Sequence, residues 1–202
     1  MKMRFVLVDT GGFVSWAIKS ATGSDWPHVA VVYQQGESEY YYESMSNKVY
    51  VTNCLGVTIR KNGVRGPLAL QNLEEWVDRE PKKRRIQYLP SDCWLPVSAE
   101  EAMRAHSILA EAAHRVRYPK AQILRNWLAL RLNIHVQWGV GSSDKWTCSE
   151  TCGRAVPPRA RHYFTMGVIP MDQLVPAGVR LPSVESGVRN WMAAEARKEA
   201  LT

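Results

Sequence analysis

The chain has 202 residues, a length that suits one domain with a sizeable hydrophobic core. Its composition, 46% apolar and 22% charged, excludes a chain that is disordered as a whole. The net charge of +7 fits either a solvated basic face or an anionic partner such as cell-wall glycan or a lipid surface. No aromatic-interleaved motif accompanies this charge, so we expect no specific nucleic acid partner.

Short segments of the sequence indicate where the protein is located and whether it binds a metal. Residues 1–9 begin with basic residues but hold too few apolar ones for a signal peptide, and no run reaches membrane-spanning length. We therefore expect a cytoplasmic protein at synthesis, without a transmembrane segment and with reduced cysteines. Cys148 and Cys152 lie four residues apart, but no second Cys or His pair completes a zinc site. We expect neither a metal nor a cofactor.

The first half of the chain predicts a helix between short strands. Residues 13–21 place Phe13, Val14, Ala17 and Ile18 at helical spacing, which predicts one apolar face. A hairpin connection at 34–38 separates two apolar runs. The predicted strands are residues 5–8, 29–33, 39–44, 49–52, 57–60 and 85–89, and a short helix is predicted at 70–79.

The second half is mostly helical by its apolar spacing. The clearest helix covers 98–117, begins with a Ser98–Glu101 capping box and carries His106 on its apolar face, where we expect a core histidine. Further helices are predicted at 123–132, at a short segment opened by Cys148, and at 185–200. The last is a peripheral helix with Trp191 and Met192 as its large apolar contacts. The order of elements predicts a single α+β domain, residues 1–202, with helices packed on an antiparallel sheet.

The most informative motif surrounds Cys148. Thr147 and Glu150 have the spacing of a capping box, which places Cys148 at the first helical position. Unpaired N–H groups and the helix dipole favour negative charge there, so the thiol is expected to ionise readily and act as a nucleophile.

A cysteine nucleophile needs a base and a group that orients it. His28 stands at the start of an apolar strand, directly after Pro27. Glu43 lies on the next predicted strand, and two adjacent antiparallel strands can set residues of one face side by side. We predict Glu43 as the orienting group, with Tyr41 and Ser44 as alternatives.

The chain resembles the circularly permuted papain-like hydrolases of the NlpC type, in which the histidine precedes the cysteine. The resemblance rests on an Ala-Thr-Gly-Ser helix end at 21–24, His-Val-Ala-Val at 28–31, Tyr-Tyr-Glu-Ser at 41–44 and Cys-Ser-Glu at 148–150. It spans roughly residues 5–175 in order. Two departures are Thr151-Cys152, where the family usually has Leu-Val, and Pro27, where a small polar residue is more usual.

The resemblance implies a permuted papain-like fold with an antiparallel sheet or barrel against helices. It also implies a catalytic triad of Cys148, His28 and Glu43 and a cysteine peptidase or amidase activity, a thiol hydrolase acting on peptidoglycan or a related amide. Relatives of this fold move acyl groups on lipids, so an acyltransferase or thioesterase stays open. A non-catalytic binding module on the same fold, with Cys148 merely buried, is the remaining hypothesis.

Overall fold

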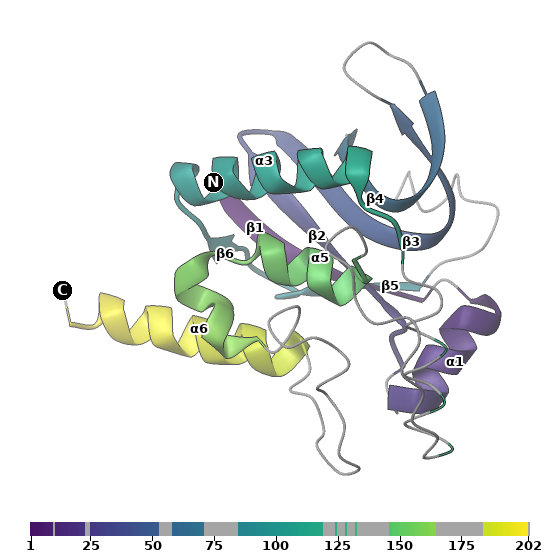
Figure 1. Ribbon diagram of the computed structural model, residues 1–202. Helices are drawn as coiled ribbons and strands as arrows, with labels where there is room; N and C mark the ends of the chain where they lie inside the picture. The colour runs from purple at the N-terminus through teal and green to yellow at the C-terminus, as the bar shows by residue number, and fades with distance from the viewer. Residues whose placement is uncertain are drawn as a thin grey trace.

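The computed structural model describes residues 1–9, 11–22, 25–52, 58–70, 85–118, 124, 128, 132, 146–164 and 184–201. It has an α+β architecture, with an antiparallel sheet and helices packed against it (Figure 1). The predicted fold class is thus confirmed at this level. No helix in these ranges is both long and apolar enough to cross a membrane.

The described part of the chain forms one six-stranded sheet in the order β4–β3–β2–β1–β5, with β6 also paired to β1. Every pairing is antiparallel. Apolar alternation sets the register, because a slip of one residue would turn every buried side chain to the other face. The strands are β1 (Lys2–Asp9), β2 (His28–Gln35), β3 (Ser38–Thr52), β4 (Thr58–Leu70), β5 (Arg85–Leu89) and β6 (Leu95–Pro96).

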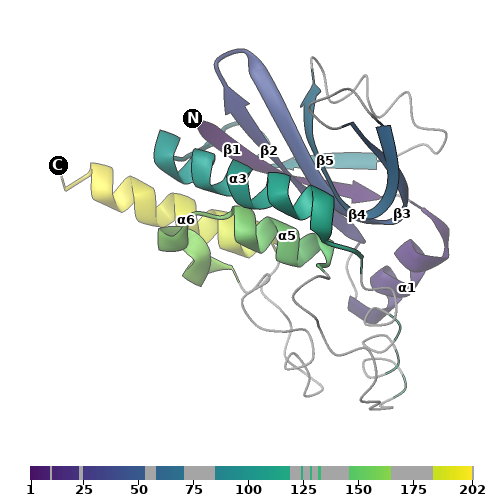
Figure 2. The same cartoon turned by 45° about the horizontal axis from the view of Figure 1, so that its top comes forward.

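Strands β3 and β4 are longer than predicted. The segments expected as separate strands at 39–44 and 49–52 are one strand of 15 residues. Register irregularities between Tyr41 and Glu43 and between Met45 and Val49 bend this ladder, as β-bulges do. In Figures 1 and 2, β3 and β4 accordingly curve away from the plane of β1 and β2. Gly36, with φ of 60°, makes the tight β2–β3 turn.

The helices are α1 (Gly12–Thr22), α3 (Ala99–Arg115), α5 (Cys148–Ala155), the 3₁₀ helix η1 (Pro158–Tyr163) and α6 (Val184–Glu199). Figures 1 and 2 show α3, α5 and α6 over one face of the sheet. Helix α1 lies apart from these three helices, at one end of the sheet. The predicted capping box of α3 is present: Ser98 Oγ accepts from the Glu101 N–H, and Glu101 Oε2 accepts from the Ser98 N–H. Of the helix expected at 70–79, only Leu70 is described, and it ends β4. The helix expected at 123–132 lies outside the described ranges except for residues 124, 128 and 132.

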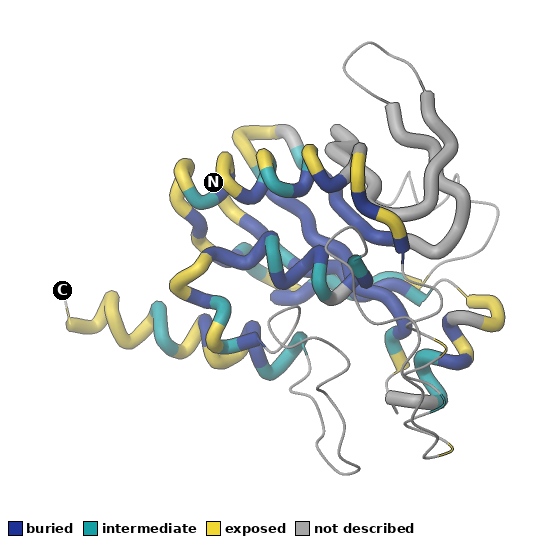
Figure 3. The backbone as a smooth tube through the Cα atoms, viewed as in Figure 1, coloured by how far each residue is buried: buried dark blue, intermediate teal, exposed yellow. Residues whose placement is uncertain are grey.

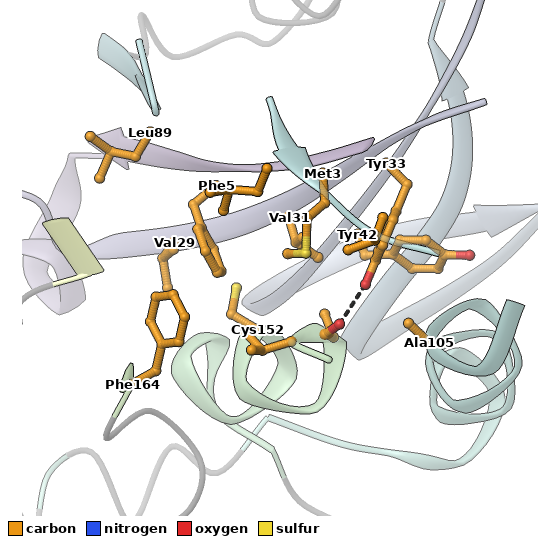
Figure 4. Close-up of a cluster of buried hydrophobic side chains, with 14 of the residues drawn as sticks. Met3, Phe5, Val29, Val31, Tyr33, Tyr42, Leu89, Ala105, Cys152 and Phe164 are labelled. Atoms are coloured by element: carbon orange, nitrogen blue, oxygen red, sulfur yellow. Dashed lines mark hydrogen bonds between the residues drawn. The ribbon is translucent and has the colours of Figure 1, made fainter. Parts of the chain in front are cut away.

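The main core lies between the sheet and the helices α3, α5 and α6 (Figures 3 and 4). Phe5 and Val31 point from the strands toward Cys152 on α5 and Phe164 after η1 (Figure 4). Tyr33 donates its hydroxyl to the Ala155 carbonyl over 2.6 Å, which fixes the end of α5 on β2. A smaller cluster on the other face of the sheet comprises Val6, Val8, Ala30, Val32 and Tyr41.

Helix α6 docks through a small residue and a large one. At Gly187 an added Cβ would lie 2.3 Å from Phe164 Cδ1, so only glycine permits this approach. Trp191 is fully buried, whereas Met192, which we expected to share the contact, is 38% exposed. Arg159 of η1 donates to Glu101 and to Glu195, linking α3 and α6.

Helix α1 corrects one part of the sequence analysis. Ala17 is buried as expected, but Phe13, placed on the same apolar face, is 74% exposed. At 100° per residue Trp16, which is 55% exposed, lies about 60° from Phe13 around the helix axis, whereas the buried Ser15 lies on the opposite side. The two aromatic side chains of this short helix therefore point outward, although Ala17, about one turn after Phe13, is buried.

Candidate active site

Cys148 is the first residue of α5, and the capping box predicted around it is present. Thr147 Oγ1 accepts from the Glu150 N–H over 3.2 Å, and Glu150 Oε2 accepts from the Thr147 N–H over 2.6 Å. Thr151 adds a bond from its Oγ1 to the Thr147 carbonyl. The thiol-bearing residue is 7% exposed, so a rigid helix start holds Cys148 at the margin of the core.

His28 begins β2 directly after Pro27, as the sequence predicts. Its register partner is Val8 near the end of β1, and α1 follows two residues after that strand ends. The residue is 8% exposed. His28 therefore occupies the end of the sheet that α1 borders.

Glu43 lies opposite Ala30 in the β2–β3 register, which sets it diagonally beside His28 on the same face. The His28 Nε2–H donates to Glu43 Oε2 over 3.0 Å, inside a site where Glu43 is fully buried. Tyr41, one of the alternative orienting residues, donates its hydroxyl to the same Oε2 over 2.8 Å. Tyr41 thus supports the carboxylate and does not replace it.

The His28 imidazole is also hydrogen-bonded to the Cys148 side chain. Burial alone would lower the pKa of His28, but the hydrogen bonds that its ring donates to Cys148 and Glu43 outweigh burial and raise the pKa to about 9. The imidazolium is therefore the favoured form at neutral pH, placed between two groups that stabilise its charge.

Ser44, the other alternative orienter, serves the cysteine segment. Its hydroxyl donates to the Trp146 carbonyl over 2.8 Å, two residues before Cys148. The Trp146 N–H in turn donates to the carbonyl of Arg117, two residues after the end of α3. Consecutive residues of β3 thus hold the two halves of the site: Glu43 binds His28, and Ser44 fixes the segment that leads to Cys148.

Tyr118 is a site residue that the sequence analysis did not identify. It is buried, and its hydroxyl is hydrogen-bonded to the Cys148 side chain. Burial, and after it the neighbouring Cys148, raise the pKa of Tyr118 well above its usual value, so the hydroxyl keeps its proton and can donate. Tyr118 follows the end of α3, so it belongs to no helix or strand whose apolar spacing would indicate that it is buried. The sole signal in the sequence was its position before Pro119 at the end of a helix.

The other described cysteines differ from Cys148. Burial raises the pKa of Cys152 well above its usual range, because this thiol is packed in the core against the sheet. The pKa of Cys93 is raised as well, chiefly by burial and then by Asp92. Cys54 lies outside the described residues.

His106 is a packed residue, as expected. Its ring lies against Tyr33, Tyr40 and Tyr42, and Nδ1 is hydrogen-bonded to the Tyr42 hydroxyl. Partial burial lowers its pKa, so the ring is neutral at physiological pH. His106 belongs to the core between β3 and α3 and lies apart from the triad.

Across the described ranges, no cluster of three or more His, Cys, Asp or Glu side chains could hold a metal ion. The site consists of a thiol, an imidazole, a carboxylate and the hydroxyls of Tyr41 and Tyr118 in one hydrogen-bonded group. Such a set can carry out nucleophilic acyl chemistry without a cofactor. In comparisons with known proteins, no family model matches this chain, and no curated protein matches it.

Proposed function

We propose that the protein is a cysteine hydrolase that cleaves an amide or peptide bond through a thioester acyl-enzyme. The observation that supports this most directly is the buried chain of contacts from Cys148 through His28 to Glu43, with the pKa of His28 raised to about 9. A cysteine that is only a small buried apolar residue has no need of an ionised partner. The contact of Cys148 with His28 therefore favours catalysis over a binding module.

The chemistry follows from the positions of the groups. The Cys148 thiolate attacks the carbonyl carbon, and the first turn of α5 supplies N–H groups and a positive dipole end for the oxyanion. His28 gives its proton to the leaving amine, and the C–N bond breaks to leave a thioester. His28 then takes a proton from water, whose oxygen attacks the thioester carbonyl. The acid leaves, and Cys148 is regenerated. Glu43 holds the ring orientation throughout.

The permuted papain-like fold of the NlpC type remains part of this proposal. The order of His28, Glu43 and Cys148 along the chain, on two paired strands and then a helix start, supports it. So does the antiparallel sheet, whose neighbouring strands β2 and β3 carry His28 and Glu43. On this basis we propose peptide or amide bonds of cell-wall peptidoglycan as the first substrates to test.

Acyl transfer is the second candidate, because the same thioester can pass to an alcohol, an amine or a thiol in place of water. The exposed aromatic face of α1, next to the His28 end of the sheet, is the observation that favours it. A lipid acyl donor would approach such a face more readily than a soluble peptide would.

The test is labelling with iodoacetamide at pH 5 to 10 with peptide mapping, followed by a screen of amide, ester and thioester substrates. We expect Cys148 to label fastest and the screen to yield a substrate whose acyl group is found on Cys148 by mass spectrometry. Cys148→Ala should abolish turnover, whereas the matched variant Cys93→Ala should keep it. Labelling of Cys148 no faster than that of Cys93 would refute the assignment.

A further inference from the structure

Cys152 is a second thiol on the helix that carries the proposed nucleophile. Cys148 is the first residue of α5, and Cys152 follows four residues later on the same helix. Four residues turn an α-helix by about 400° and advance it by about 6 Å, so the two side chains leave the same face one turn apart. Both belong to the core between α5 and the sheet, where Cys152 is fully enclosed and Cys148 is 7% exposed (Figure 4).

The two thiols have different surroundings. Cys148 stands at the helix N-terminus and is hydrogen-bonded to the His28 imidazolium, and both features favour a thiolate. Burial, and after it the neighbouring Cys148 and Glu43, raise the pKa of Cys152 well above its usual range, so this thiol keeps its proton. Peroxide oxidises thiolates in preference to thiols, so Cys148 is the residue that it attacks.

We propose that hydrogen peroxide converts Cys148 and Cys152 into a reversible disulfide, which makes the start of α5 a redox modification site. In the first step the Cys148 thiolate attacks one oxygen of the peroxide, the O–O bond breaks and hydroxide leaves, and Cys148 becomes a sulfenic acid. In the second step the Cys152 sulfur attacks the Cys148 sulfur, the S–O bond breaks, and the hydroxyl leaves as water with the Cys152 proton. The two cysteines lose two electrons in total, and the peroxide gains them.

Helix geometry determines what must move for this bond to form. Residues four apart in a helix have Cα atoms about 6 Å apart, within the range of a disulfide. Their Cβ atoms are about 5–6 Å apart, whereas a disulfide needs about 4 Å, so the first turn of α5 must open. Cys148 is the residue that moves, because it begins the helix and Cys152 is packed in the core. The disulfide therefore draws Cys148 away from His28 and disrupts the Thr147–Glu150 capping box.

A disulfide formed in this way is strained, and a strained disulfide is readily reduced. The oxidised protein is inactive because its nucleophile is bonded, and a thiol reductant restores the nucleophile. Without Cys152, the sulfenic acid of Cys148 meets a second peroxide and becomes a sulfinic acid, which thiol reductants do not reverse. Cys152 thus protects the nucleophile. This inference rests on the reactive thiol of the proposed function and on no particular substrate.

Peptide mapping tests the bond directly. Trypsin cleaves after Lys145 and Arg154, so residues 146–154 form one peptide that contains both cysteines. Full-length protein is treated with hydrogen peroxide and then alkylated with iodoacetamide under denaturing conditions. We expect this peptide to carry no alkyl group and to be two hydrogen atoms lighter than its reduced form. Dithiothreitol added before alkylation should restore a peptide with both cysteines alkylated.

Replacing Cys152 separates a thiol that resolves the sulfenic acid from one that only fills space. Cys152→Val keeps an apolar side chain of similar volume in the core. After peroxide, dithiothreitol should restore about tenfold less Cys148 labelling in this variant than in the wild type, because the sulfinic acid has formed. Cys93→Ala removes a free thiol outside α5 and should behave like the wild type. Mapping of the wild-type protein decides the question by itself if valine impairs folding.

Three results would overturn the inference. One is a peroxide-treated wild type whose peptide 146–154 has no internal disulfide. Another is a disulfide that joins Cys148 to Cys54 or Cys93, and the third is a Cys152→Val protein that recovers as fully as the wild type. The substrate screen separates this inference from the proposed function. Turnover through Cys148 without the disulfide would count against the disulfide alone, and the disulfide in a protein that turns over no substrate would count against the function alone.

Discussion

Glu43 shows at the residue scale how the site depends on burial. Its carboxylate is fully enclosed, and an enclosed charge is costly unless it is paired and hydrogen-bonded. Oε2 accepts from both His28 and Tyr41, and the imidazolium supplies the opposite charge. The same pairing that stabilises the carboxylate therefore keeps His28 protonated and aimed at Cys148.

Replacing Glu43 by Gln should leave the fold intact and lower turnover by orders of magnitude, because the amide removes the charge and can present a donor to the ring. An analogous orienter change in a serine protease costs about 10⁴-fold. Tyr41→Phe is the matched control: it removes one hydrogen bond to the same oxygen but keeps the charge, so its effect should be much smaller. Turnover and a melting curve for each variant measure this. A folded Glu43→Gln protein with wild-type turnover would remove Glu43 from the triad.

Tyr118→Phe tests the residue that the sequence did not reveal. Its hydroxyl donates to the cysteine side chain, and loss of that donor should disfavour the thiolate. We expect the pH at half-maximal iodoacetamide labelling of Cys148 to rise, with a melting temperature close to that of the wild type. Tyr42→Phe removes a different buried hydroxyl, one bonded to His106, and should leave the labelling profile unchanged. An unaltered profile in Tyr118→Phe would show that the contact has no influence on the thiol.

At the scale of elements, the sequence predicted correctly those features that depend on the residues of one short segment. The Thr147–Glu150 and Ser98–Glu101 boxes, the His28 strand and β5 were all predicted from spacing within a few residues. The prediction failed for features that depend on contacts between segments far apart in the sequence. The extent of β3 depends on its partner β4, and the exposure of Phe13 depends on how α1 packs in the folded chain. Tyr118 meets Cys148 only in the folded chain, 30 residues apart in sequence.

Thr147→Val should weaken the helix start that carries Cys148. Loss of an N-cap costs about 0.5–2 kcal/mol, and fraying of the first turn should also slow labelling of Cys148 at neutral pH. Ser98→Ala removes the equivalent cap from α3 and should cost a similar amount without slowing the labelling. Urea denaturation and labelling rates measure both effects. If the two variants lower the labelling rate equally, the effect is one of global stability and the local cap has no special role.

Gly187→Ala tests the docking of α6. The new Cβ would lie 2.3 Å from Phe164 Cδ1 and 3.0 Å from the Tyr163 carbonyl, and Phe164 is buried and has little room to move. Overpacking of this kind costs about 1–3 kcal/mol, more than the helix propensity that alanine gains. Asn190→Ala, at an exposed position of α6, should be neutral or slightly stabilising. If the Gly187→Ala protein were as stable as the wild type, α6 would be able to move away from Phe164 without a loss in the free energy of unfolding.

At the scale of the whole molecule, the two layers meet at the active site. The sheet provides His28 and Glu43, and the helical layer provides Cys148 and, from the end of α3, Tyr118. Ser44 and Trp146 join the layers next to these residues. Because His28 is hydrogen-bonded both to Glu43 within the sheet and to Cys148 of the helical layer, its protonation contributes to the stability of the whole fold.

The free energy of unfolding should therefore change with pH as His28 titrates. Folding raises its pKa from 6.5 to about 9, so its stabilising contribution is complete below pH 6.5 and is lost as the pH rises through 9. At 1.36 kcal/mol per pKa unit, the loss is on the order of 3 kcal/mol. We expect the free energy of unfolding of the wild type to fall over this window relative to that of His28→Gln, which has no group to titrate at this position. Urea denaturation at half-unit pH steps measures both proteins. Curves that stay parallel from pH 6 to 10 would contradict an imidazolium held between Cys148 and Glu43.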